Sequence, residues 1–189
     1  MTTPIRHAHR LPRFAWLSAL AALVTIGLKT GAWALTGSVG LLSDALESLV
    51  NLAGAMLAIA MLTVAARPED DDHPYGHDKA EYFSSGAEGA LILIAALGIG
   101  MAAVRRLISP HALEQVGSGL AVSAVAALVN LGVALVIGRA GRTHHSVTLE
   151  ANASHLMTDV WTSAGVLVGV ALVSFTGWQW LDPAVALLV

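Results

Sequence analysis

Hydrophobic residues occur along this chain in long continuous runs that are separated by short polar segments. Five of these runs have about 20 residues or more, the length that an α-helix needs to cross the hydrocarbon core of a bilayer. Because the runs do not alternate in segments of about ten residues, helices are favoured over a β-barrel. The predicted helices lie near residues 14–35, 41–66, 83–104, 119–137 and 147–175, and a sixth begins at Asp182–Pro183.

The sixth apolar run is too short to cross a membrane before the sequence stops at Val189. Proline is favoured in the first turn of a helix, so Pro183 supports a helix start here. We therefore expect an all-α membrane protein whose residues 1–189 form one transmembrane domain that is cut within helix 6. In the fifth run, Gly165 and Gly169 are four residues apart and are expected to allow close helix packing within the chain.

The composition is that of a membrane protein. Hydrophobic residues make up 56% of the chain and charged residues only 12%, whereas soluble domains carry about 25% charged residues. This argues against the alternative of a soluble helical core. The chain has no Cys, so a metal would be bound by His, carboxylate, amide or water. The net charge of −3 gives no indication of a nucleic-acid partner.

The basic residues predict the orientation in the membrane, because cytoplasmic loops are enriched in Lys and Arg. The first apolar run is longer than the hydrophobic part of a signal peptide and is read as a retained helix. Lys29 lies inside this run and is expected to extend its side chain to the outer interface. The N-terminus is predicted to be cytoplasmic. The basic residues on the same side are Arg6, Arg10, Arg13, Arg67, Lys79, Arg139 and Arg142, and those on the other side are Lys29, Arg105 and Arg106.

Polar residues inside two of the predicted helices form matched pairs. Glu47 and Asn51 are four residues apart and share one helix face, as do His155 and Asp159. A charged residue at the centre of a membrane helix costs about 2.5–3.5 kcal/mol on insertion scales, so such groups point toward a partner or a watery cavity. Together the four side chains offer one imidazole, two carboxylates and an amide oxygen, a suitable set for a four-coordinate divalent metal ion. Asp44 lies on nearly the same face as Glu47 and is expected to support these ligands.

The alternative reading of these residues is that they form hydrogen bonds between helices that stabilise the bundle. The prediction of a metal site also requires that the four residues lie at the same depth in the membrane. Glu47 lies near the predicted outer end of its helix, while His155 lies near the inner end of a helix that begins at Val147. A deep cavity or an earlier helix start would be needed to bring them together.

Three motifs resemble those of the cation diffusion facilitators. The stretch TGSVGLLSDA at residues 36–45 is similar to the family's helix 1–2 signature, and HPYGHDKAE at 73–81 is similar to its first cytoplasmic loop. Glu150 and Asn152, followed by His155 and Asp159, are similar to its fifth helix. The motifs occur in the family's order and cover nearly the whole chain.

The resemblance implies a six-helix transmembrane bundle of the cation diffusion facilitator type, in a bacterial inner membrane. Members export zinc and related divalent cations from the cytoplasm, mostly in exchange for protons. They are homodimers and usually carry a soluble cytoplasmic domain after helix 6. The resemblance maps the transport site onto Glu47, Asn51, His155 and Asp159, with no cofactor beyond the transported ion. It also suggests a second metal site in the loop, at Asp70, His73 and His77.

Two positions depart from the family pattern. Zinc members typically have His or Asp where this chain has Glu47, and Asp where it has Asn51. An amide oxygen suits harder ions, whereas the imidazole of His155 suits zinc, iron, cobalt and nickel. Zinc is the first choice, and iron, cobalt, cadmium and manganese remain alternatives.

Three functions are compatible with this set of residues. In a metal/proton antiporter, protons and metal compete for the same deprotonated ligands, and imidazole has an ordinary pKa near 6.5 that suits such exchange. A metal-dependent intramembrane enzyme would activate water on the metal, but the chain has no His-Glu-x-x-His motif. A passive cation channel would need weak binding at several places along a pore. The sequence favours the antiporter.

Overall fold

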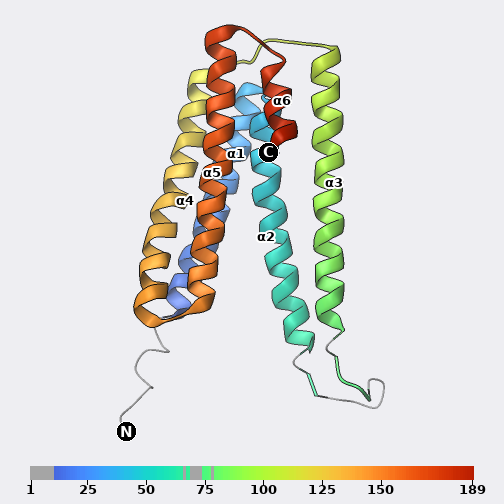
Figure 1. Cartoon of the computed structure of the whole chain (residues 1–189), viewed down its shortest axis with the longest axis vertical. Helices are drawn as coiled ribbons and strands as arrows, with labels where there is room; N and C mark the ends of the chain where they lie inside the picture. Colours follow the sequence, from blue (N-terminus) through green and yellow to red (C-terminus); the bar gives the residue numbers. More distant parts are fainter. Residues whose placement is uncertain (1–10, 66, 69–73, 78) are drawn as a thin grey trace.

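A computed structural model describes residues 11–65, 67–68, 74–77 and 79–189 of the chain (Figure 1). All regular secondary structure in this part of the chain is helical, as predicted, and it has no strand. Five of its helices are long and apolar enough to cross a membrane. The six helices are α1 (Leu11–Thr36), α2 (Val39–Ala65), α3 (Ala80–Ile108), α4 (Val116–His144), α5 (Val147–Thr176) and α6 (Leu181–Leu188).

The helices extend beyond several of the predicted ends, because apolar runs mark the part of a helix inside the hydrocarbon and not its interfacial turns. The largest difference is at α4, which was predicted to end near residue 137 and continues to His144. There His145 adopts a left-handed backbone with a φ of 50°. Ser146 then caps α5, its hydroxyl oxygen accepting a hydrogen bond of 3.4 Å from the Leu149 N–H.

The helices form two groups with α6 between them. Helices α1, α4 and α5 pack together, α2 pairs with α3, and α6 contacts α2, α3 and α5. Helix α2 also contacts α1 and α5, so it joins the two groups. Toward the end that carries the α2–α3 connection, the α2–α3 pair diverges from the other group (Figure 1).

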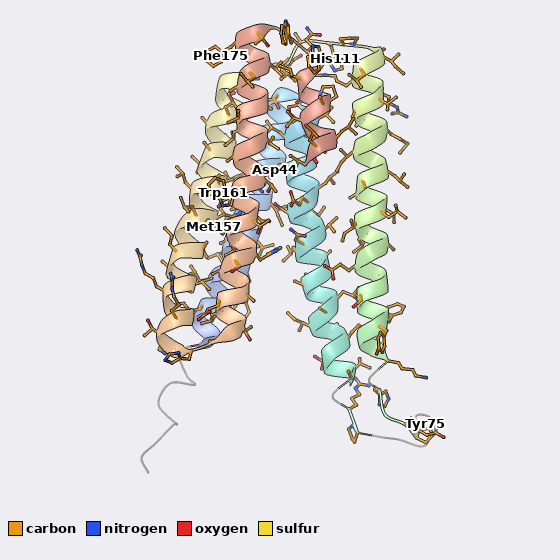
Figure 2. The ribbon with its side chains drawn as sticks, viewed as in Figure 1. Asp44, Tyr75, His111, Met157, Trp161 and Phe175 are labelled. Carbon is orange, nitrogen blue, oxygen red and sulfur yellow. The ribbon has the colours of Figure 1, made fainter. Side chains whose placement is uncertain are left out.

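The outer surface of the bundle is apolar over most of its length. Large side chains such as Trp161 and Phe175 on α5, and Leu97 on α3, are exposed (Figure 2). In a soluble protein such a surface would aggregate, whereas in a bilayer lipid tails cover it. The interior is built largely from Ala, Val, Ser and Leu, small enough for the helices to approach closely.

A buried carboxylate connects α6 to the start of α2. Asp182 accepts hydrogen bonds from the hydroxyl of Ser38 and from the backbone N–H groups of Val39 (2.8 Å) and Gly40 (3.2 Å). The first N–H groups of a helix have no partner within the helix, and the helix dipole favours a negative charge there. Asp182 therefore caps α2 across the bundle and places α6 beside it.

The two glycines of α5 differ in their surroundings. A Cβ atom on Gly169 would lie 2.5 Å from a methyl carbon of Val185 in α6, whereas one on Gly165 would meet nothing within 4 Å. The close helix packing that we predicted for this pair therefore occurs between α5 and α6 of the same chain. Of the two glycines, it involves Gly169 only.

We expect Gly169→Ala to destabilise the protein by about 1–3 kcal/mol, the usual cost of overpacking. Gly165→Ala is the matched control, and it should be neutral or stabilising by up to about 1 kcal/mol because Ala is the better helix former. Denaturant unfolding of both variants in the same detergent tests this. Equal stabilities for the two variants would contradict the packing of α5 against α6.

Candidate cation site between α2 and α5

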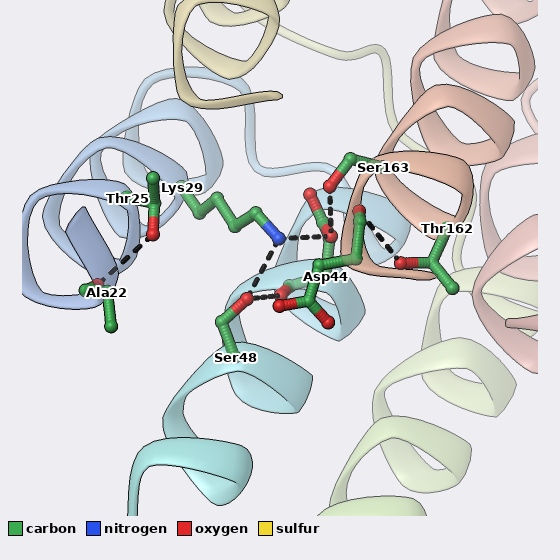
Figure 3. Close-up of polar contacts among 8 residues, drawn as sticks. Ala22, Thr25, Lys29, Asp44, Ser48, Thr162 and Ser163 are labelled. Carbon is green, nitrogen blue, oxygen red and sulfur yellow. Dashed lines mark hydrogen bonds and ion pairs between the residues drawn. The ribbon is translucent and has the colours of Figure 1, made fainter. Parts of the chain in front are cut away.

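A buried ion pair lies at the centre of the bundle. The Lys29 Nζ atom is 2.8 Å from Oδ1 of Asp44 and donates a second hydrogen bond of 2.8 Å to the hydroxyl of Ser48 (Figure 3). Only 1% of Lys29 is exposed. The prediction that Lys29 extends to the outer interface is therefore wrong. Its side chain turns inward because Asp44 supplies a counter-charge and Ser48 supplies an acceptor.

The same carboxylate joins α2 to α5. The hydroxyl of Ser163 donates a 2.8 Å hydrogen bond to Oδ1 of Asp44, the oxygen that also binds Lys29 (Figure 3). Helices α2 and α5 run in opposite directions. The residue one turn after Asp44 on α2 therefore faces the residue one turn before Ser163 on α5. This places Ser48 near the level of Asp159, and Asn51 near the level of His155. Asn51, His155 and Asp159 therefore lie at neighbouring levels of the bundle, although α5 begins at Val147 as predicted.

Three of the four predicted site residues border one cavity. Asn51, His155 and Asp159 line a cavity of about 320 Å³ between α1, α2, α4 and α5. Asp159 is 7% exposed, and His155 is more exposed. The cavity continues along α2 as far as Ile59, toward the end of the bundle that carries the α2–α3 connection.

Glu47 is placed differently from the other three. It lines a second cavity of about 550 Å³ between α2, α3 and α6, which Asn51 also borders. Asp159 and Thr162 on α5 are nevertheless within electrostatic reach of its carboxylate, as are Asp44 and Lys29. One Glu47 oxygen, Oε2, is buried and has no hydrogen-bond partner within the described residues.

The predicted ligands do not form a closed metal site in this structure. Over the described ranges, no three His, Asp or Glu side chains are close enough together to bind one metal ion. Asp44 lines neither of the two cavities and is engaged by Lys29 and Ser163, with its Oδ2 atom buried and unpaired among the described residues. The four-residue metal site and the supporting role of Asp44 stay predictions.

The second predicted site lies in the connection between α2 and α3. Asp70 and His73 are outside the described residues. His77 is half-buried just before α3. The loop site therefore also stays a prediction.

Two polar residues of the bundle were not identified from the sequence. Asn130 on α4 is 1% exposed and lines the same cavity as His155 and Asp159, and its amide oxygen has no partner in the described part of the chain. Glu88 on α3 packs against Gly54 of α2, where a Cβ atom would lie 3.0 Å from the Glu88 carboxyl carbon. A polar residue within each apolar run is the signal that could have revealed both, since such residues are costly in a membrane.

Comparison with known proteins gives relatives over nearly the whole chain. The family model of the cation efflux transmembrane domain matches residues 15–189. An uncharacterised transporter of Synechocystis sp. is 59% identical over 179 residues, which are 94% of this chain and 58% of that protein. Cation-efflux pumps named FieF are also similar. The Shewanella oneidensis pump is 31% identical over 172 residues (91% of this chain, 58% of the pump). The Serratia proteamaculans pump is 32% identical over 181 residues (95% and 60%). The chain thus spans less than two thirds of the length of these relatives.

We expect Lys29→Met to destabilise the bundle by about 3–5 kcal/mol, because it leaves the carboxylate of Asp44 buried without its counter-ion. Adding Asp44→Asn should recover most of this loss, since a neutral amide needs no counter-ion and still accepts the Ser163 hydrogen bond. Denaturant unfolding in detergent gives the free energies of unfolding of the natural protein and of both variants.

Lys79→Met, which removes an exposed lysine before α3, is the control. Equal stabilities for Lys29→Met and Lys79→Met would show that the buried pair contributes nothing to the fold.

Proposed function

The chain belongs to the cation efflux family, the cation diffusion facilitators, and we propose on that basis that it exports a divalent metal cation in exchange for protons. The observation that carries this proposal is the cavity bordered by Asn51, His155 and Asp159. Ionisable groups inside a membrane are costly and are retained where they serve ion or proton pathways. The relatives compared above are named as transporters or pumps, which favours transport over the enzyme alternative.

The charge balance around α2 and α5 also favours a cationic substrate. Asp44, Glu47 and Asp159 lie within electrostatic reach of the single ammonium group of Lys29. With the imidazole of His155 neutral, one ammonium group and three ionised carboxylates leave this region with an excess of negative charge. A divalent metal ion, or protons in its absence, would neutralise that excess. The same ligands must lose protons to bind metal, so the two cations compete for one place.

The shape of the cavity suggests which side of the membrane it serves. It extends from Asp159 toward the end that carries the α2–α3 connection, and the Lys29–Asp44–Ser163 contacts lie at its opposite end. The distribution of basic residues favours a cytoplasmic location for that first end. The arrangement therefore corresponds to a state that loads metal from the cytoplasm, and rocking of α2 against α5 would expose the site to the other side.

Glu47 would complete the site during this movement. It borders the neighbouring cavity, one helical turn from Asn51, and Asp159 lies within its electrostatic reach. A small rotation of α2 about its axis would bring its carboxylate toward His155 and Asp159. Metal binding would favour that rotation because it supplies the positive charge that the three ligands lack.

The donor set is compatible with zinc, which we propose as the first substrate. Imidazole and carboxylate ligands suit zinc, iron and cobalt, while the amide oxygen of Asn51 weakens the site for zinc and favours harder ions such as manganese. Cadmium is a further alternative. The homodimer, the inner-membrane location, the cytoplasmic N-terminus and the loop site at Asp70, His73 and His77 are proposed from the family resemblance and the distribution of basic residues.

We expect Asp159→Ala and His155→Ala each to reduce zinc transport by about 100-fold or more, because even partners of a metal ligand contribute 10–100-fold to affinity. Zinc uptake into proteoliposomes of the natural full-length protein, with an acidic interior, is the measurement. Thr158→Ala, an exposed hydroxyl on the same helix, is the control and should transport normally.

Undiminished flux in both variants, with correct insertion, would overturn the site assignment. Flux that does not respond to the pH gradient would instead indicate a passive channel.

We also expect Asn51→Asp to raise zinc transport relative to manganese, since a carboxylate replaces a neutral oxygen and restores the residue typical of zinc members. The ratio of the two uptake rates in the same proteoliposomes is the readout. Asn152→Asp changes another amide that lines the cavity and should leave the ratio nearly unchanged. If Asn51→Asp behaves like Asn152→Asp, Asn51 does not determine the choice of metal.

A further inference from the structure

A third cavity, with basic residues in its lining, lies at the other end of the bundle, away from the α2–α3 connection. It has a volume of about 500 Å³ and is formed by the end of α1, the start of α2 and the last turns of α3. Arg105, Arg106 and His111 line it. We propose that this cavity binds a phosphate group, and that Arg106 is its principal ligand. The proposal is independent of the transported metal.

The surroundings of Arg106 carry the proposal. The residue is only 4% exposed, and its Nε and Nη2 atoms are buried without a hydrogen-bond partner among the described residues. A buried charge without a partner is strongly unfavourable, so buried guanidinium groups are normally paired. The structure therefore buries two donors of one guanidinium group in a residue that lines a cavity, and the described residues supply no acceptor for them.

Helix-dipole stabilisation does not account for this geometry. Arg105 and Arg106 are both in the last turn of α3, where positive charge is favourable. That effect operates for exposed side chains as well, and exposed Arg105 satisfies it. It gives no reason to bury Arg106 with two unpaired donors.

The ligand is expected to be an anion with several acceptor oxygens. Among the described residues that line the cavity, two are Arg, one is His and none is Asp or Glu. A guanidinium group presents its N–H donors in a planar fork that matches two oxygens of a phosphate or carboxylate. His111 is oriented by a 3.0 Å contact between its Nδ1 and the carbonyl oxygen of Ser109.

The position of the cavity favours a phospholipid head group as the source of the phosphate. The cavity lies at the ends of membrane-spanning helices, where the phosphates of lipid head groups are concentrated, and a guanidinium group there is suited to bind one of them. The rest of its lining is largely apolar and includes Trp33, Leu42 and Ile108, which could contact the start of an acyl chain. Free phosphate would use the arginine but not this apolar lining.

Binding to the delipidated full-length protein in a neutral detergent tests the proposal. The probes are short-chain phosphatidylglycerol, inorganic phosphate, and a galactolipid of matched chains that has no phosphate. Phosphatidylglycerol at saturating concentration should raise the unfolding temperature by several degrees. The galactolipid should raise it less.

Arg106→Gln should weaken phosphatidylglycerol binding by about tenfold or more, because it removes a charge-assisted bidentate contact. Arg139→Gln, which changes an exposed arginine of α4, is the matched control and should bind as the natural protein does. Should Arg106→Gln fail to fold, Arg106→Lys retains the charge without the planar fork and should still weaken binding.

The outcomes separate the sources of phosphate. An Arg106-dependent response to the lipid supports a head-group site, and an Arg106-dependent response to inorganic phosphate alone supports a site for the free anion. Equal responses to phosphatidylglycerol and galactolipid, or responses that the Arg106 variants do not reduce, would overturn the phosphate site.

Discussion

The arrangement of the central helices depends on the buried carboxylate of Asp44. It binds the ammonium group of Lys29 on α1 and the hydroxyl of Ser163 on α5 through a single oxygen atom. Three helices are thereby held at one level in a region with little water to replace these contacts. Because α2 and α5 are antiparallel, this one contact sets which residues face each other over the following two turns. The neighbourhood of Asn51, His155 and Asp159 follows from it.

The helices and the pairs of polar residues could be predicted from the sequence, because both follow from local rules. An apolar run of sufficient length must be a helix in a bilayer, and residues four apart in a helix share a face. The helix ends could not be placed as well. Interfacial residues such as Arg142 continue a helix after the apolar run has ended, and the left-handed backbone of His145 ends it.

The direction of a long side chain and the closure of a site could not be predicted, because both depend on the distance between helices. Lys29 was expected to turn outward, since nothing in its own helix offers a counter-charge. Its partner is 15 residues away on the next helix. In the same way, the sequence shows which residues share a face of one helix. It does not show the rotation of α2 that directs Glu47 toward α3 and α6. Asn130 is visible in the sequence as a polar residue in an apolar run, but the cavity that it lines is formed by four helices together and could not be predicted.

Helix α6 has two attachments of different physical kinds. Through Asp182 it is bound to the first turn of α2 by three hydrogen bonds to a buried charge. Through Val185 it packs against Gly169 of α5, which is a van der Waals contact. Hydrogen bonds are directional and are lost when their atoms separate. A side chain packed on a glycine can shift along the helix without losing a directional contact. If the two groups of helices move relative to each other, α6 would therefore move together with α2. The displacement would then occur between α6 and α5.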